Sequence, residues 1–254
     1  AFQDLGVGEN RDVSFSYDVS DGNGGVATEN VVITVSGSND GPVAVAGVNT
    51  AVEDGGVVTG TLSASDVDGD ALSFSLNTGP SEGSVVVNAD GSYSFDPGSS
   101  FQDLGVGESR DVSFSYDVSD GNGGVATESV VITVSGSNDG PVAVAGVNTA
   151  VEDGGVVTGT LSASDIDGDA LSYSLNTGPS EGSVVVNADG SYSFDPGSNF
   201  QDLGVGESRD VSFSYDVSDG NGGVATENVV ITVSGRSENN TSPIAVSGVN
   251  TAVE

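Results

Sequence analysis

Residues 112–119, Val-Ser-Phe-Ser-Tyr-Asp-Val-Ser, alternate large apolar side chains with small polar ones. A period of two places successive side chains on opposite faces of an extended strand, whereas a helix repeats every 3.6 residues. The face that carries Phe114 and Tyr116 is therefore expected to enter a core, and the opposite face is expected to meet water. This stretch predicts a half-buried β-strand.

The same alternation marks the neighbouring segments, and turn residues separate them. Residues 88–91 (Asn-Ala-Asp-Gly) predict a hairpin turn, and residues 120–124 (Asp-Gly-Asn-Gly-Gly) predict another between strands at 111–119 and 125–134. We expect about seven strands per unit and no helix, which means an all-β fold of antiparallel Greek-key sandwiches. The other alternating apolar residues are Leu72, Phe74, Leu76, Val85, Val87, Tyr93 and Phe95.

These aromatic side chains allow an alternative interpretation, a surface on which sugars stack. However, their spacing places each of them on the face expected to be buried, and none lies outside the alternation. The pattern favours a role in the core.

A period of 99 residues organises the whole chain. Phe-Gln-Asp-Leu-Gly-Val-Gly-Glu begins at Phe2, Phe101 and Phe200. Asn-Asp-Gly-Pro segments follow apolar strands and are the natural boundaries, because proline ends a strand. On this phase residues 37–135 and 136–234 are complete sandwiches. Tandem copies of one unit favour a structural, length-giving role over catalysis.

The terminal parts do not make complete units on this phase. Residues 1–36 correspond to the end of a preceding repeat, and residues 235–254 correspond to a linker and the first strand of a following one. Each lacks the middle of a repeat, so neither is expected to fold alone.

Composition excludes several functions. The chain has 38 acidic residues, four arginines, no lysine, histidine or cysteine, and a formal net charge of −34. Without His or Cys it has no zinc, haem or thiol chemistry of the usual kinds and no Ser-His-Asp triad. The charge opposes nucleic acid and anionic membranes as partners, and no apolar run is long enough for a membrane span. Hard cations are the favoured partners, although acidity can also serve solubility alone.

The acidic residues converge in one repeated motif. Residues 66–70 read Asp-Val-Asp-Gly-Asp, and residues 165–169 read Asp-Ile-Asp-Gly-Asp. Three carboxylates in five residues repel one another unless a cation neutralises them, and one bent loop can aim their oxygens at a single point. We therefore predict Ca²⁺ sites at these motifs, the alternative being solvated turns. The predicted ligands are Asp66, Asp68, Asp70, Asp165, Asp167 and Asp169.

Further acids and amides recur around the linkers, where a sandwich is expected to bring them near the same end. Asn39, Asp40, Asn138 and Asp139 lie in the linkers, Glu53 follows the first strand, and Asp120 and Asp219 open the last hairpin turn. Their recurrence predicts that they join the same calcium sites.

Residues 104–108, 114–124 and 131–141 together resemble the VCBS repeat of large secreted bacterial RTX-type adhesins. The resemblance implies a cadherin-like or Ig-like sandwich, secretion to the cell surface, and a role in attachment or biofilm formation. The layout is also similar to cadherins, in which neighbouring domains share calcium. By that likeness the first linker would use Asn39, Asp40, Asp66, Asp68 and Asp120. The second would use Glu53, Asn138, Asp139, Asp165, Asp167 and Asp219.

The cadherin pattern is incomplete in this chain. Ser36 and Ser135 stand where the cadherin linker begins with an aspartate, and the Asp-Arg-Glu motif is missing, for which Asp96 is a partial substitute. The resemblance therefore implies fewer ions per linker than cadherins hold.

We expect a non-enzymatic, calcium-rigidified extender of a bacterial surface adhesin. Its partners would be calcium and the neighbouring repeats, and it would project a distal ligand-binding domain. One alternative is a lectin-like module whose calcium contacts sugar, which would need an open coordination position. Another is a glycosidase with paired carboxylates, but no cleft-forming insertion interrupts the 99-residue unit.

Overall fold

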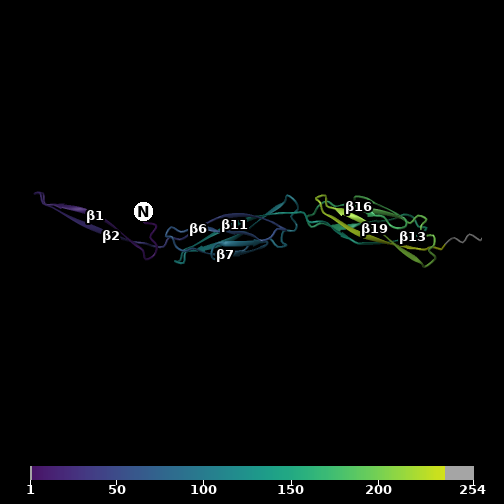
Figure 1. Cartoon of the computed structure of the whole chain (residues 1–254), viewed down its shortest axis with the longest axis horizontal. Helices are drawn as coiled ribbons and strands as arrows, with labels where there is room; N and C mark the ends of the chain where they lie inside the picture. Colours follow the sequence, from purple (N-terminus) through teal and green to yellow (C-terminus); the bar gives the residue numbers. More distant parts are fainter. Residues whose placement is uncertain (1, 238–254) are drawn as a thin grey trace, which may run out of the picture. The chain divides into compact units, whose positions relative to one another are not determined.

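The computed structural model describes residues 2–237 and contains strands, turns and loops, with no helix in that range. The chain divides into two compact units, Ala1–Asp139 and Gly140–Glu254 (Figure 1). Among the described residues no helix is long and apolar enough to cross a membrane. The expected all-β class is confirmed, whereas the exact domain phase stays a prediction. The following strand predicted after residue 237 lies outside the described residues.

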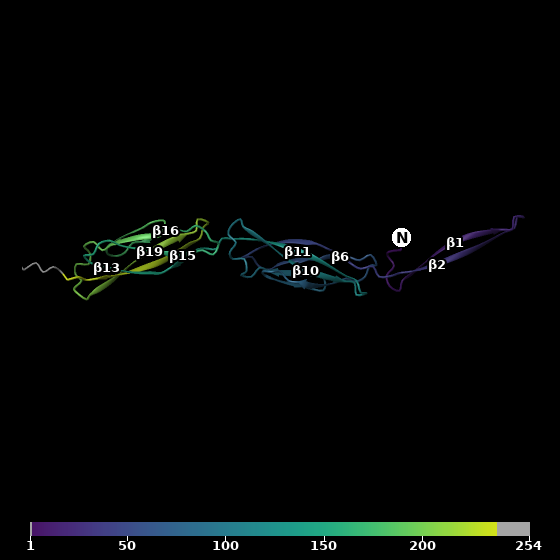
Figure 2. The same cartoon turned by 180° about the vertical axis from the view of Figure 1, so that it is seen from behind.

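The first unit contains a two-layer sandwich after its N-terminal hairpin. One layer has the order β4-β11-β10-β7, and the other has the order β5-β9-β8, with β3 and β6 as an additional pair. The long central strands β10 and β11 lie side by side (Figure 2). The strands are β3 (Val43–Val45), β4 (Gly47–Val52), β5 (Val58–Thr61), β6 (Ser63–Ser65), β7 (Ser73–Thr78), β8 (Ser84–Val87), β9 (Ser92–Asp96), β10 (Ser109–Ser119) and β11 (Val125–Ser135).

The alternating residues form the core as predicted. Phe114 and Tyr116 on β10 are buried, while the serines beside them lie on the outer face. Tyr93 and Phe95 on β9 come from the facing layer, and the Tyr93 and Phe114 rings lie 5.2 Å apart between centroids. Aromatic pairs at this separation stabilise a core beyond the area that they bury. The interpretation as a sugar-stacking surface is wrong for these rings.

The repeat has nine strand segments instead of about seven, because two strands change sheet along their length. β3 pairs with β6 in antiparallel fashion, and after Ala46 the chain continues as β4, which pairs in parallel with β11. Likewise β5 and β6 are separated at Leu62, which is buried. The alternation of burial continues through Leu62, whereas at Ala46 it shifts by one residue, because Val45 and Ala46 are both exposed. Residues 43–48 are all small or apolar (Val-Ala-Val-Ala-Gly-Val), so the sequence does not reveal that shift.

One predicted core residue is exposed. Leu76 was expected to follow Leu72 and Phe74 into the core, but its side chain is 40% exposed. The register of β7 with β10 shifts there, since Tyr116 pairs with Leu76 and Ser115 pairs with Thr78. The extra residue, Asn77, forms a bulge that ends the alternation on this edge strand.

The second unit repeats the same sandwich. Its layers have the orders β13-β20-β19-β16 and β14-β18-β17, with β12 and β15 as the additional pair. The core residues match those of the first unit, with Phe213 and Tyr215 buried on β19. The strands are β12 (Val142–Val144), β13 (Gly146–Val151), β14 (Val157–Thr160), β15 (Ser162–Ser164), β16 (Ser172–Thr177), β17 (Ser183–Val186), β18 (Ser191–Asp195), β19 (Ser208–Ser218) and β20 (Val224–Ser234).

The N-terminal segment forms a two-stranded hairpin, β1 (Asn10–Ser20) with β2 (Val26–Ser36). Its pairing register matches that of β10 with β11, but no second layer covers it within residues 2–237. Phe15 is 53% exposed, whereas its counterpart Phe114 is 2% exposed. This part was expected not to fold alone. Its hairpin indeed buries no core of its own, but its two strands are formed.

Candidate metal centre

The loop that follows β6 gathers three carboxylates. Asp66 accepts hydrogen bonds through Oδ1 from the backbone amides of Asp68 (2.9 Å) and Asp70 (3.4 Å). These bonds bend the chain back, and Gly69 completes the turn with φ of 79°, a conformation that glycine adopts without strain. Each of the three aspartates can place one oxygen within 4.8 Å of the others. The predicted convergence of Asp66, Asp68 and Asp70 is therefore present.

The first linker lies directly against this loop. The backbone amide of Asp40 donates to Oδ2 of Asp68 (2.7 Å), and the side-chain amide of Asn39 donates to Oδ2 of Asp120 (2.8 Å). Asp120 is buried, and its Oδ1 accepts the amides of Asn122 and Gly124. Three segments far apart in sequence thus meet at one end of the sandwich.

Three oxygens of this group have no hydrogen-bond partner within the described residues although each is buried: Asn39 Oδ1, Asp66 Oδ2 and Asp68 Oδ1. Leaving buried oxygens without a partner is costly, and it is costlier still when they are ionised. Carboxylate and amide oxygens are the ligands that Ca²⁺ prefers. These residues therefore fit a hard cation.

The side chain of Asp120 remains ionised in this arrangement. The hydrogen bond from Asn39 lowers the pKa of Asp120, and the amides of Asn122 and Gly124 lower it further against the opposing effect of desolvation. A second amide bridge joins the turn to the loop, since Asn122 Nδ2 donates to Asp70 Oδ2 (2.8 Å). The loop at 66–70 and the turn at 120–124 are thus held together in a form that favours negative charge.

The second unit builds the same loop. Asp165 accepts the amides of Asp167 (3.0 Å) and Asp169 (3.3 Å), and Asn221 donates to Asp169 (2.7 Å). The carboxylates of Asp165, Asp167 and Asp169 again come within 4.8 Å of one another. Asp219 is buried and accepts the amides of its own turn. Because both units form this loop, it is a property of the repeat.

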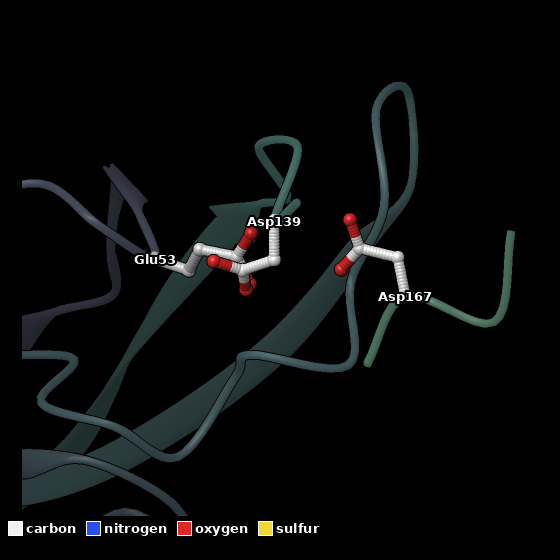
Figure 3. A group of neighbouring side chains, drawn as sticks. All are labelled: Glu53, Asp139 and Asp167. Atoms are coloured by element: carbon white, nitrogen blue, oxygen red, sulfur yellow. The ribbon is translucent and has the colours of Figure 1, made fainter. Parts of the chain in front are cut away.

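A buried glutamate lies at the opposite end of the first sandwich. Glu53 follows β4 and is 1% exposed. Its Oε1 accepts the amide of Ser137 in the second linker (2.6 Å), and its Oε2 is buried without a hydrogen-bond partner among residues 2–237. The carboxylate of Asp139 points toward it (Figure 3). Burial raises the pKa of Glu53, and the negative charges of Asp139 and Asp54 add to this effect.

Glu152 repeats this arrangement in the second unit. It is fully buried, and its Oε1 accepts the amide of Arg236 (2.5 Å). Its Oε2 likewise has no hydrogen-bond partner in the part of the chain that the structure describes. A buried carboxylate with one satisfied oxygen at the same position in both repeats fits a second kind of position for a hard cation.

The predicted site residues therefore divide between the two ends of a sandwich. β11 begins just after Asp120 and ends at Ser135, which pairs with Val52 next to Glu53. Glu53 consequently lies with Asp139, while Asn138 is a half-buried neighbour of Asp139 in the same linker. Asp96, the partial substitute for the missing motif, is exposed and accepts the amide of Gly98 in a local turn. The residues at the first end are Asn39, Asp40, Asp66, Asp68, Asp70 and Asp120.

Sequence reasoning missed the loop at residues 2–9, which also reaches this end. A Cβ on Gly6 would lie 3.5 Å from the Cβ of Asp68. A Cβ on Gly37 would come within 2.3 Å of the carbonyl oxygens of Leu5 and Gly6, so only glycine fits there. The signal that could have revealed this contact is the recurrence of glycine at 37, 136 and 235, each opposite a Leu-Gly-Val-Gly-Glu loop.

One known protein family matches most of the chain. The sequence pattern of the bacterial cadherin-like domain matches residues 39–136 and 138–235. The chain belongs to this family, and its two matched segments are tandem copies. The predicted cadherin-like tandem repeat is confirmed. No curated protein sequence is significantly similar to the chain.

Several solved structures share the fold. Mouse protocadherin-24 EC1-3 is 16% identical with a TM-score of 0.57, over 89% of this chain and 80% of that one. Mouse clustered PcdhgC3 EC1-3 is 13% identical with a TM-score of 0.54, over 93% and 80%. The protocadherin gammaB7 EC3-6 cis-dimer structure is 13% identical with a TM-score of 0.53, over 89% and 60%. At these identities the likeness establishes the fold.

Proposed function

We propose that this chain is a calcium-rigidified structural extender of a secreted bacterial surface adhesin. Membership of the bacterial cadherin-like family and the tandem arrangement of its repeats support an adhesion-related structural role outside the cell. The resemblance to VCBS repeats supports the setting, a large RTX-type protein that projects a distal ligand-binding domain in attachment or biofilm formation.

The observation that carries this proposal is the group of buried oxygens around the first linker. Asn39 Oδ1, Asp66 Oδ2 and Asp68 Oδ1 have no hydrogen-bond partner within residues 2–237. In a chain with a net charge of −34, further carboxylates crowded together raise the electrostatic energy unless a cation binds. Calcium supplies that neutralisation and accepts six to eight oxygen ligands.

Binding at this place would stiffen the linker. The ligand oxygens come from the linker itself, from the loop at 66–70 and from the turn at 120–124, which are separate segments of the chain. Without the ion, the hydrogen bonds donated by Asn39, Asp40 and Asn122 oppose the repulsion between these segments. With it, one ion ties the linker to the sandwich, and each linker of the array gains the same restraint. The likeness to the bacterial cadherin-like family supports the neighbouring repeats of the chain as partners of one another.

X-ray scattering of the full chain, recorded in calcium and in chelator, tests the proposal. We expect a longer maximum dimension and a narrower range of conformations in calcium. The double variant Asp68→Asn/Asp167→Asn should behave in calcium as the parent chain does in chelator, because each repeat loses one carboxylate from its loop.

The matched control is Asp111→Asn/Asp210→Asn, which removes the same charge from exposed strand positions that accept Thr133 and Thr232 hydroxyls. This control should keep the full response to calcium. Identical scattering of the parent chain in calcium and chelator would overturn the proposal. A glycan array on the same protein tests the lectin-like alternative, and calcium-dependent sugar binding by each repeat would favour it.

A further inference from the structure

The chain enters and leaves each sandwich through two strands that are bonded to each other. In the first unit it enters at β3, continues as β4 on one edge of the sheet, and leaves at the end of β11. β4 and β11 pair in parallel, from Gly47 with Val130 to Val52 with Ser135. In the second unit β13 and β20 pair in the same way, and the chain leaves at the end of β20.

This topology decides how a pull along the chain reaches a sandwich. A pull on the preceding chain draws β4 back toward Gly47, and a pull on the following chain draws β11 forward toward Ser135. The two parallel strands are thus loaded in opposite directions along their length. Their hydrogen bonds run between the strands and are evenly spaced, so they share the load and must break together before the strands can slide. A pull across the sheet would instead open the bonds one after another.

The backbone bonds of β4 continue to its last residue and beyond. The amide of Glu53 donates to the carbonyl of Ser135 (3.1 Å). Because parallel pairing uses alternate residues, the amides of Asn49 and Ala51 lie on the same side, toward β11. The amide of Thr50 points away from β11 and donates to the side-chain oxygen of Asn49 (2.9 Å). The second unit has the equivalent bonds.

Side chains hold the same entering segment to the rest of the sandwich. The buried Tyr116 hydroxyl accepts the amide of Val45 (3.2 Å) and donates to its carbonyl (2.6 Å), where β3 ends. Asn49 donates through Nδ2 to the Tyr93 hydroxyl of the facing layer (2.9 Å). β3 itself pairs with β6. The second unit repeats the bond to the carbonyl and the bond between the asparagine and the tyrosine. Both layers therefore oppose withdrawal of the first strand.

We propose that each repeat bears tension along the chain, with the pairs β4–β11 and β13–β20 acting as shear clamps. A sandwich loaded in this way unfolds only when its first strand slides off its last one. None of the predicted cation ligands lies between Gly47 and Val52, so the clamp acts with or without calcium. Load-bearing is thus a function beyond the stiffening of the linkers. Because the units are joined in series, each clamp carries the full tension of the chain.

Single-molecule measurements at constant force on the full chain test this inference. They are made in chelator, so that the outcome does not depend on the calcium proposal. Pulled by its two ends, the chain should give two long-lived unfolding events, each lengthening it by roughly 30 nm, close to the extended length of a repeat.

The direction of pull is the decisive comparison. The chain has no cysteine, so Val48→Cys/Ser75→Cys places two attachment points on exposed positions of β4 and β7, the two edges of one sheet. Pulled across the sheet at the same force, the first unit should unfold at least about tenfold faster than it does end to end, because its bonds open in turn. Equal lifetimes in the two directions, or a shorter lifetime end to end, would overturn the inference.

A pair of proline variants locates the resistance. Ala51→Pro/Ala150→Pro removes an amide on the paired side in both units, and the end-to-end lifetime should fall at least about tenfold. The matched control Thr50→Pro/Thr149→Pro removes the neighbouring amide, which faces away from the partner strand, and should keep the lifetime within about threefold. Equal losses in the two variants would contradict the clamp. If Ala51→Pro/Ala150→Pro does not fold, the comparison of directions in the chain with its native β4 still decides the matter.

Discussion

The β1–β2 and β10–β11 hairpins have nearly the same sequence and the same register, but only one of them has a core. Phe114 on β10 is 2% exposed and Phe15 on β1 is 53% exposed. Asp120 receives the Asn39 side chain, whereas Asp21 receives only the amides of its own turn. The difference teaches that the hairpin is a local property of the sequence, while burial and the candidate metal centre require the rest of the repeat.

The largest expected difference is in packing. Phe114→Ala should destabilise the first unit by about 3–5 kcal/mol, because it leaves a cavity in the core. Phe15→Ala should change stability by less than about 0.5 kcal/mol in the monomer. Calorimetry of the full chain measures both. Phe114→Ala should give the first unit a separate unfolding transition, at least about 10 °C below that of the second unit, which keeps Phe213. Equal effects of the two substitutions would mean that the hairpin is packed.

The second expected difference between the two hairpins is in the exchange rate of their backbone amides. An isolated two-stranded hairpin is marginally stable in water, whereas β10 and β11 open only with their sandwich. Backbone amides of β10 should therefore exchange at least about a hundredfold more slowly than those of β1 in a dilute monomer. Segmental isotope labelling is required because the two strands give identical peptides. Similar protection in both hairpins would contradict the comparison.

The candidate metal centre provides the third contrast. Asp120→Asn should weaken calcium binding at the first linker at least about tenfold, since a carboxylate in contact with Asn39 is lost. Asp21→Asn removes the same charge from the same turn of the exposed hairpin and should leave calcium binding unchanged. Titration with a calcium-sensitive dye measures both variants. A similar loss in the two would mean that the effect is one of overall charge.

The smallest expected effect concerns Glu53. Burial raises the pKa of Glu53, so folding favours its protonated form. In chelator its contribution to stability is therefore complete below the unfolded pKa and falls as the pH rises from there through the folded value. Glu53→Gln should remove this dependence and stabilise the calcium-free first unit at pH 7 by about 1 kcal/mol.

Thermal unfolding from about pH 4 to about pH 8 measures this dependence across the usual range of glutamate titration. The control is Glu29→Gln, which lies exposed on β2 and should change little. In calcium the sign should reverse, because a carboxylate available to the ion is lost. A Glu53→Gln chain that is less stable in chelator would contradict the assignment of Glu53 as a buried, costly charge.

Much of the fold follows from the sequence, because alternation reports which face of a strand is apolar. The strand over 111–119 and the turns at 88–91 and 120–124 are where their residues predict them. Alternation cannot report where a strand changes sheet, so the breaks at Ala46 and Leu62 were missed. It also cannot report the bulge at Asn77 that leaves Leu76 exposed.

The candidate site was predictable in composition but not in grouping. The aspartate loop at 66–70 is local, so its convergence follows from spacing and from Gly69. The contacts of Asn39 with Asp120 and of Asp40 with Asp68 join residues 81 and 28 positions apart. Only the recurrence of these residues around each linker indicated them. The burial of Glu53 depends on the Ser137 amide, which no sequence motif specifies.

Isothermal titration of the calcium-free full chain with Ca²⁺ tests the central claim most directly. We expect saturable binding below about 1 mM, the range of extracellular calcium modules and sensors. The heat should be strongly reduced by Asp68→Asn/Asp167→Asn and unchanged by Asp111→Asn/Asp210→Asn. A parent chain that gives no saturable heat in that range, or two double variants that bind alike, would contradict the claim that carboxylates around the linkers are assembled to hold calcium.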